Sequence, residues 1–282
     1  MRKQIALSAI LLAGCGLAAG CGSGGEADNA RTNCTPAHPG VSTLTDGTLT
    51  VAVATLPPFT GADGNELLGL EGDILSAIAE RECLTIQVQS LDFPTAITAA
   101  QTGRADISSG NWWCTAKRAE TMGLVGPVYT DKLGITSREG IDTFSAVEGR
   151  PVGTVDGYNW NADLEKVYGA NLKTYPSASV MYQDLQAGRI DAAFDSSAAA
   201  TYANQQRGGE WQIKIAQPDE RIRASLKGPQ VCFPVPANNA SLKEALNADV
   251  EALRTEGALG EFLTKNELDP SAADTGPLNL ID

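Results

Sequence analysis

Two copies of one short pattern constrain the fold of this chain more than any other feature of its sequence. The pattern Gly-Arg-x-Asp occurs at residues 103–106 and again at residues 188–191. Glycine suits the left-handed position after a helix, the arginine faces the last helical carbonyls, and the small or apolar residues that follow are typical of a buried parallel strand. Each copy therefore predicts the end of a helix and the start of a central strand. Two such units predict two α/β lobes.

The same two units predict where a ligand binds. Ligands of open α/β sheets bind outside the carboxyl ends of the strands, so the segments after Asp106 and Asp191 are expected to face each other across a cleft. A chain of 282 residues, 43% hydrophobic and 20% charged, is large enough for two domains of ordinary size. A net charge of -13 without clustered lysine and arginine argues against binding to nucleic acid.

The N-terminus predicts export and a lipid anchor. An arginine and a lysine precede an apolar run at residues 5–12, which is typical of a secretory signal peptide. The small residues that follow end at Cys21, and this resembles a bacterial lipoprotein signal, in which the cysteine is lipidated and becomes the new N-terminus. Cys15 also matches, but cleavage there leaves an apolar core at the short end of the usual ~7–15 residues. A membrane span is disfavoured because it needs about 20 apolar residues. We therefore expect a signal peptide at residues 1–20.

Residues 21–46 are expected to form a flexible linker between the anchor and the folded part. The stretch is rich in glycine, asparagine, threonine and proline. The mature protein is then held by its lipid on the outer face of the cell membrane.

Four cysteines remain in the expected mature chain beyond the lipidation signal. An even number in an exported protein predicts disulfides, with three possible connectivities. Cys34 precedes the first expected strand and Cys83 the second, and neighbouring parallel strands bring their starts together. We therefore predict the pairs Cys34–Cys83 and Cys114–Cys232. A zinc site is disfavoured, because there is no C-x-x-C pair and the only histidine, His38, lies in the expected linker outside the fold. No cofactor or metal is expected.

Hydrophobic periodicity and breaker residues predict alternating strands and helices. Ser241 and Glu244 form a capping box that opens a helix ended by Gly257. The polar tail from Asp269 is expected to be loose. Strands are predicted at residues 48–54, 85–90, 151–155, 172–175 and 230–235, and helices at residues 72–82, 94–102, 161–168, 179–187 and 258–265.

The order of several short motifs resembles the extracellular solute-binding proteins of polar amino acid ABC importers, family 3. The resemblance covers about residues 49–268. Its motifs are Pro-Pro-Phe at 57–59, Gly-Arg-Ala-Asp at 103–106, Thr-Ala-Lys-Arg at 115–118, Gly-Pro-Val-Tyr at 126–129, Val-Glu-Gly-Arg-Pro-Val-Gly at 147–153 and Gly-Arg-Ile-Asp at 188–191.

The resemblance implies a two-lobed, type II periplasmic-binding-protein-like α/β fold. Its two mixed sheets are flanked by helices and joined by a two-strand hinge. The first lobe would take residues 47–134 and 229–268, the second residues 135–228, and residues 269–282 would form the tail. It implies a monomeric binding protein rather than an enzyme, which delivers its solute to an ABC permease. The absence of a G-x-x-x-x-G-K-[ST] loop from this sequence places the ATPase on a separate chain.

The resemblance also implies that Arg118 binds the carboxylate of the ligand. A guanidinium offers a planar, two-pronged donor set that matches a carboxylate. The alternative for Arg118 is a surface pair with Glu120. Thr115 is expected to cap the short helix that carries this arginine, at least as readily as it contacts ligand.

The chain departs from the family in the segments expected to face the ligand. Asn111, Trp112 and Trp113 stand where the family has small hydroxyl residues or glycine. In the second lobe, Tyr158 and Asn159 replace the threonines of a Gly-Thr-Thr segment.

A further departure concerns recognition of an α-ammonium group. The position of the family's ammonium-binding aspartate is occupied by Ser196, and Asp195 falls one place short. A one-residue offset on a strand reverses the direction of a side chain unless the strand ends or bulges there. Whether this protein binds an α-ammonium group is therefore open.

Three of the four tryptophans lie in the two segments expected to face the ligand, in a chain that is 6% aromatic. With Phe59 and Tyr158 they predict an aromatic-lined pocket, in which Trp113 and Trp160 face the ligand. Such a pocket suits a flat apolar side chain or a cation with few N–H donors.

These features together predict capture of a small carboxylate-bearing, amino-acid-like solute by hinge closure. One alternative is a binder of an aromatic acid or a betaine-type quaternary amine. A second is a dehydratase-like enzyme on the same fold, using Glu66, Glu71 or Asp195 as acid or base. A serine or cysteine nucleophile would lack a histidine base, because His38 is expected outside the fold.

Overall fold

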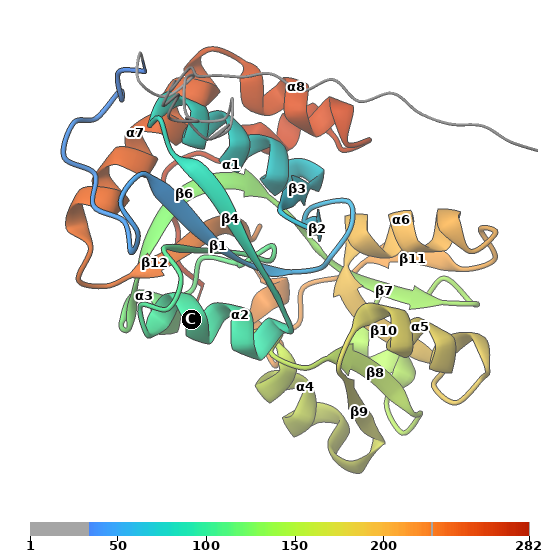
Figure 1. The fold of residues 1–282 in the computed structure, drawn as a ribbon. Helices are drawn as coiled ribbons and strands as arrows, with labels where there is room; N and C mark the ends of the chain where they lie inside the picture. The colour runs from blue at the N-terminus through green and yellow to red at the C-terminus, as the bar shows by residue number, and fades with distance from the viewer. Residues whose placement is uncertain (1–33, 227, 282) are drawn as a thin grey trace, which may run out of the picture. The chain divides into compact units, whose positions relative to one another are not determined.

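Two main β-sheets form the cores around which the chain folds (Figure 1). The computed structural model describes residues 34–226 and 228–281. The first sheet is parallel, with the order β4-β1-β5. Helices α1 and α2 lie on its opposite faces (Figure 1). These elements are β1 (Thr48–Ala54), α1 (Gly69–Arg81), β4 (Thr85–Leu91), α2 (Phe93–Gln101) and β5 (Ile107–Ser109).

Local sequence explains these elements. Helix α1 buries Leu70, Ile74 and Ile78, which recur at helical spacing on one face. Helix α2 is capped by Asp92, whose side chain accepts a hydrogen bond from the Thr95 amide. It is followed by Gly103 with φ of 67°, the left-handed conformation expected of the first repeated unit.

The second sheet has five strands in the order β11-β7-β10-β8-β9. Strands β8, β9 and β10 run parallel, whereas β7 is antiparallel to both β10 and β11. Helices α4, α5 and α6 lie beside this sheet (Figure 1). The elements are β7 (Leu133–Ser137), β8 (Val152–Val155), α4 (Asn161–Tyr168), β9 (Leu172–Tyr175), α5 (Ala178–Gln186), β10 (Ala192–Ser196), α6 (Ser197–Gln206) and β11 (Gln212–Ile215).

Strands β6 and β12 form an antiparallel pair, in which β6 leads into the second sheet and β12 receives the chain on its return. The chain passes from β6 to β7 through Asp131 and Lys132, and returns to β12 after β11. These two passages agree with the expected two-strand connection. The two α/β halves agree with the expected fold class. The remaining elements are the hairpin β2 (Gly61–Asp63) and β3 (Glu66–Leu68), α3 (Ala116–Ala119), β6 (Met122–Thr130), β12 (Gln230–Pro236), α7 (Ala240–Thr255) and α8 (Ala258–Lys265).

One predicted disulfide is formed between Cys114 and Cys232, whose sulfurs are bonded across 118 residues of sequence. Cys34 and Cys83 are each disulfide-bonded as well, in agreement with the second predicted pair. Cys15, Cys21 and the expected signal peptide lie outside the described residues. Within the part of the chain that is described, no helix has the length and apolar character needed to cross a bilayer.

Three local expectations are wrong. The cap of α7 is Asn239, which accepts from the Leu242 amide, so the helix begins before the expected capping box. The C-terminal tail is fastened: Ile281 donates its amide to the Cys114 carbonyl and accepts from the Ala116 amide. His38 does not lie outside the fold, because its imidazole is hydrogen-bonded to Glu82 at 2.6 Å.

Candidate functional site

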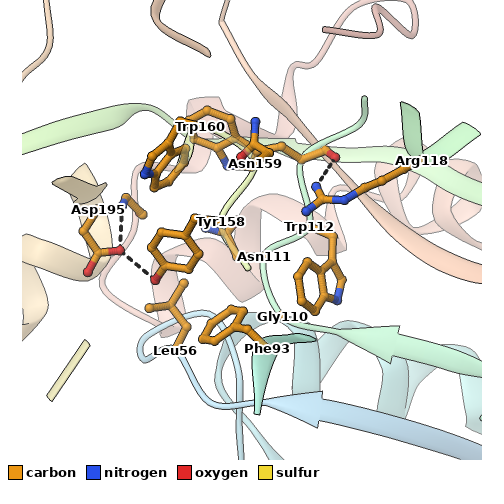
Figure 2. A pocket seen from close by; sticks show the side chains of 12 residues that line it. Leu56, Phe93, Gly110, Asn111, Trp112, Arg118, Tyr158, Asn159, Trp160 and Asp195 are labelled. Atoms are coloured by element: carbon orange, nitrogen blue, oxygen red, sulfur yellow. Dashed lines mark hydrogen bonds between the residues drawn. The ribbon is translucent and has the colours of Figure 1, made fainter. Parts of the chain in front are cut away.

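A small pocket lies where the segments that follow strands of the two sheets meet (Figure 2). Its free volume is about 20 Å³, room for about one water molecule. The segments after both repeated units contribute, as the strand-end rule predicts. The lining residues are Leu56, Phe93, Gly110, Asn111, Trp112, Trp113, Arg118, Tyr158, Asn159, Trp160, Asp195 and Ser196.

The loop after β5 is held in place by the buried carboxylate of Glu71. One carboxylate oxygen accepts from the Ser109 hydroxyl at 2.6 Å and the Gly110 amide at 2.9 Å. The other accepts from the Asn111 amide at 2.9 Å and the Tyr129 hydroxyl at 2.8 Å. Burial raises the pKa of Glu71, against the effect of these four donors. Glu71 therefore holds the loop that lines the pocket and does not itself line it.

Asp131, on the passage from β6 to β7, connects residues from both sheets. Its carboxylate accepts from the Asn111 side-chain amide at 2.7 Å, the Trp113 indole N–H at 3.4 Å and the Ser196 hydroxyl at 2.9 Å. Desolvation raises its pKa. Sequence reasoning missed Asp131, whose only signal is its place at the end of β6.

Arg118 reaches the pocket from the short helix α3. Thr115 caps that helix, as expected, by accepting from the Arg118 amide at 3.1 Å. The guanidinium donates to the Trp113 carbonyl at 2.6 Å and lies 5.2 Å from the ring centroid of Trp112. Burial lowers the pKa of Arg118 to about 10, so the group remains a cation at neutral pH.

Aromatic side chains occupy most of the space between the two halves of the site (Figure 2). The rings of Trp113 and Trp160 meet with centroids 4.8 Å apart, and Trp160 also meets Tyr158 at 4.8 Å. Phe93 packs edge-on against Tyr158 at 5.2 Å and against Trp112 at 5.5 Å. The expected aromatic lining is present, and in this conformation it fills the pocket with its own rings.

Asp195 lies at the wall of the pocket, fully buried near the end of β10. Its carboxylate accepts from the hydroxyls of Tyr158 and Tyr182, both at 3.0 Å, and from the Ser196 amide at 2.8 Å. Burial raises the pKa of Asp195 to about 7. Ser196 in turn caps α6 through the Ala199 amide while it donates to Asp131. Two tyrosine hydroxyls and a backbone amide therefore already satisfy Asp195, and Asp131 with the Ala199 amide satisfies Ser196.

The structure brings together most of the residues singled out from the sequence. Phe59 is the exception: it stacks on Tyr129 at 5.4 Å, outside this pocket. Leu56 and Phe93 line the pocket instead, and the sequence analysis did not predict either of them. Phe93 could have been predicted from the sequence, because it follows the carboxyl end of strand β4, where ligands of such sheets bind. Among the candidate acids of an enzyme, Glu66 lies in the short strand β3 and is exposed.

Comparison with known proteins agrees with this fold. The profile of the bacterial extracellular solute-binding proteins, family 3, matches residues 49–266. The probable amino-acid-binding protein YxeM of Bacillus subtilis (strain 168) is 25% identical over 217 residues, 74% of this chain and 79% of that protein. The lysine/arginine/ornithine-binding periplasmic protein of Escherichia coli (strain K12) is 21% identical, over 75% of this chain and 84% of that protein. Among solved structures, an ancestral arginine-binding protein bound to glutamine superimposes with a TM-score of 0.69 at 25% identity, covering 79% of this chain and 98% of that one.

Proposed function

Because the chain belongs to the bacterial extracellular solute-binding proteins of family 3, we propose that it captures a small carboxylate-bearing, amino-acid-like solute at Arg118. It is a solute-binding protein of an ABC importer and not an enzyme. Delivery of the solute to a permease, driven by a separate ATPase chain, is part of the proposal. The relatives support the solute class, since they are named for binding amino acids.

The environment of Arg118 is the observation that carries this proposal. Within residues 34–226 and 228–281, no carboxylate lies within ion-pair distance of its guanidinium, which meets only a carbonyl and an indole face. A half-buried cation with neutral partners is stabilised when an anion compensates its charge. A solute carboxylate would provide that anion, and a charge-assisted bond of this kind contributes about 1.5–3 kcal/mol.

Binding requires the two halves of the site to separate and close again. A volume of about 20 Å³ is far below the roughly 300 Å³ or more of ligand pockets. We infer that a solute enters when the halves carrying residues 47–134 with 229–268 and residues 135–228 move apart. The solute favours closure by touching both: Arg118 on one side, and Tyr158, Asn159, Trp160, Asp195 or Ser196 on the other.

An aromatic acid or a betaine-type quaternary amine is the second candidate solute. The aromatic wall favours it, as ring faces attract such cations by about 0.5–2 kcal/mol. The satisfied hydrogen bonds of Asp195 and Ser196 also favour a ligand with few N–H donors.

The test is a thermal-shift screen of amino acids, betaines and aromatic acids, followed by calorimetry with the solute found. A ligand at 100 times its Kd adds about 2.7 kcal/mol to native stability. Arg118→Ala should weaken binding more than tenfold, and Arg118→Lys should not restore it. Arg138→Ala is the matched control, because that guanidinium stacks on Trp211 at 4.3 Å, outside the pocket. Unchanged affinity in Arg118→Ala would refute the proposed site.

We propose that Cys21 carries a lipid that holds the protein on the outer face of the membrane. Cys21 follows small residues after the apolar run, whereas Cys15 leaves that run short. Cys21→Ser should release protein from the membrane fraction or block processing, and Cys15→Ser should do neither. The opposite pattern would assign the lipid to Cys15.

A further inference from the structure

Outside the pocket, a second cluster of polar side chains joins three distant parts of the chain. His38 precedes the first strand, Glu82 follows α1, and Asp249 lies in the middle of α7. The imidazole Nδ1 of His38 is 2.6 Å from Glu82 Oε1 and 3.8 Å from Asp249 Oδ1. One donor atom from each residue falls within 4.8 Å of the other two. The spacing is that of a set of groups converging on one point.

Asp249 occupies a position where α7 otherwise carries apolar residues. The buried face of this helix contains Leu246, Val250 and Leu253 at helical spacing, and Asp249 falls within that stripe. Its side chain is only 1% exposed. In the described part of the chain, its Oδ2 atom has no hydrogen-bond partner. A buried carboxylate oxygen without a donor is a costly group that points to a missing partner.

The charges of the cluster are also unbalanced. Glu82 and Asp249 bring two buried carboxylates together, and His38 supplies one positive charge only when it is protonated. Arg81, next to Glu82 in the chain, forms its ion pair with Glu256. Buried charges are paired or coordinate metals, because desolvation is otherwise too costly. A divalent cation would neutralise both carboxylates while the imidazole remained neutral.

We propose that His38, Glu82 and Asp249 form a binding site for a divalent transition metal ion, with Zn²⁺ as the best match. Zn²⁺ accepts imidazole nitrogen and carboxylate oxygen together in about four-coordinate sites, and three protein ligands leave one position for water. Ca²⁺ requires about six to eight oxygen ligands, and Mg²⁺ a near-ideal octahedron. The His38 side chain is 38% exposed, which gives the ion and its water a route from solvent.

Such an ion would add to the attachment that the disulfide-bonded Cys34 and Cys83 already give the segment before β1. The backbone already begins this attachment, since the Ala37 amide donates to the Arg81 carbonyl and the His38 amide to Glu82 at 3.2 Å. The metal would act on the segment between the expected anchor and the fold. It would not touch the solute pocket, so this proposal stands apart from the proposed function.

The test uses the mature chain without a polyhistidine tag, stripped with EDTA and then titrated with ZnCl₂. Zinc at 100 times its Kd should raise Tm by about 5–10 °C, with MgCl₂ as the comparison ion. Asp249→Asn and His38→Gln should each abolish the zinc-dependent shift. Glu139→Gln, an exposed carboxylate paired with Arg150, should retain it. Co²⁺ in place of Zn²⁺ should give a visible absorption band that disappears in His38→Gln.

Two results would overturn the proposal. No shift in Tm with zinc up to 1 mM, about the weakest affinity that would matter for an extracellular module, would leave the cluster as a hydrogen-bonded contact only. A zinc-dependent shift of equal size in wild type and His38→Gln would place the metal elsewhere. His38→Gln alters a partly exposed residue, so it remains a valid test if Asp249→Asn fails to fold.

Discussion

Trp113 and Trp160 pack against each other with ring centroids 4.8 Å apart and planes inclined at 60°. One follows a strand of the first sheet and the other follows a strand of the second. Each is at most 4% exposed. The pair fills space between the two halves of the pocket, so a solute bound there must replace this contact with contacts of its own.

Solute binding should therefore change the fluorescence of these two tryptophans. Separating the indoles alters the polarity around both rings, whereas Trp211 lies outside the pocket beneath Arg138. The emission change on adding solute should be largely lost in the double variant Trp113→Phe/Trp160→Phe. Trp211→Phe should keep it. A change that persists in the double variant would show that the indole pair stays together during binding.

Replacing Glu71 with glutamine should destabilise the protein by at least about 2 kcal/mol, because burying unsatisfied polar groups costs about 1–3 kcal/mol each. Each carboxylate oxygen accepts two hydrogen bonds, and the amide would direct its own N–H groups at two of those donors. Urea unfolding measures the loss. The control is Asp73→Asn, on the same helix as Glu71. It removes a surface ion pair with Lys265 of α8 and should cost less than about 1 kcal/mol. Equal losses in the two variants would contradict the role assigned to Glu71.

The stability contributed by Asp195 should fall as pH rises from about 4 to 7. Its pKa is raised from 3.8 to about 7 in the folded state, so the folded protein keeps a proton that the unfolded chain has released. The effect amounts to at most about 4 kcal/mol, at about 1.4 kcal/mol per pKa unit. Asp195→Asn should therefore gain stability relative to wild type at pH 8 compared with pH 5, measured by urea unfolding. The exposed Asp191→Asn serves as control. A pH profile parallel to that of wild type would exclude this effect.

The Cys114–Cys232 disulfide should stabilise the protein by about 2–5 kcal/mol, since it closes a long loop in the unfolded chain. Cys114 also lies between Trp113 and the cap residue Thr115, so the bond holds the segment that carries Arg118. Cys114→Ala/Cys232→Ala should lower the urea midpoint and weaken solute binding. Non-reducing peptide mapping confirms the bond in wild type. An unchanged midpoint would show that the segment before α3 and strand β12 need no covalent link.

The sequence predicted the elements whose signals are local. Strand β1 and helices α4 and α8 have the predicted bounds, because their apolar periodicity lies within the element and their breakers, such as Gly257, lie directly beside it. The cleft was predicted by a topological rule applied to Asp106 and Asp191. Arg118 was assigned through a resemblance, and its helix cap through local chemistry.

What could not be predicted depends on contacts between distant segments. Nothing near Phe59 indicates that it stacks on Tyr129 while Leu56 turns toward the pocket. Asp131 gains its role only when Asn111 and Ser196 meet it from different sheets. From the sequence alone His38 is predicted to be part of a linker, because its contacts with Glu82 and Asp249 come from distant parts of the chain.

The fastened C-terminus has a practical consequence for protein engineering. Ile281 pairs with Thr115 and exchanges backbone hydrogen bonds with Cys114 and Ala116, two residues before Arg118. A purification tag or fluorescent fusion joined after residue 282 would therefore begin within one residue of the strand contact that borders the Arg118 helix. Sensors that report solute binding are better built by insertion at the exposed turn of residues 208–209, where the chain carries two adjacent glycines between α6 and β11.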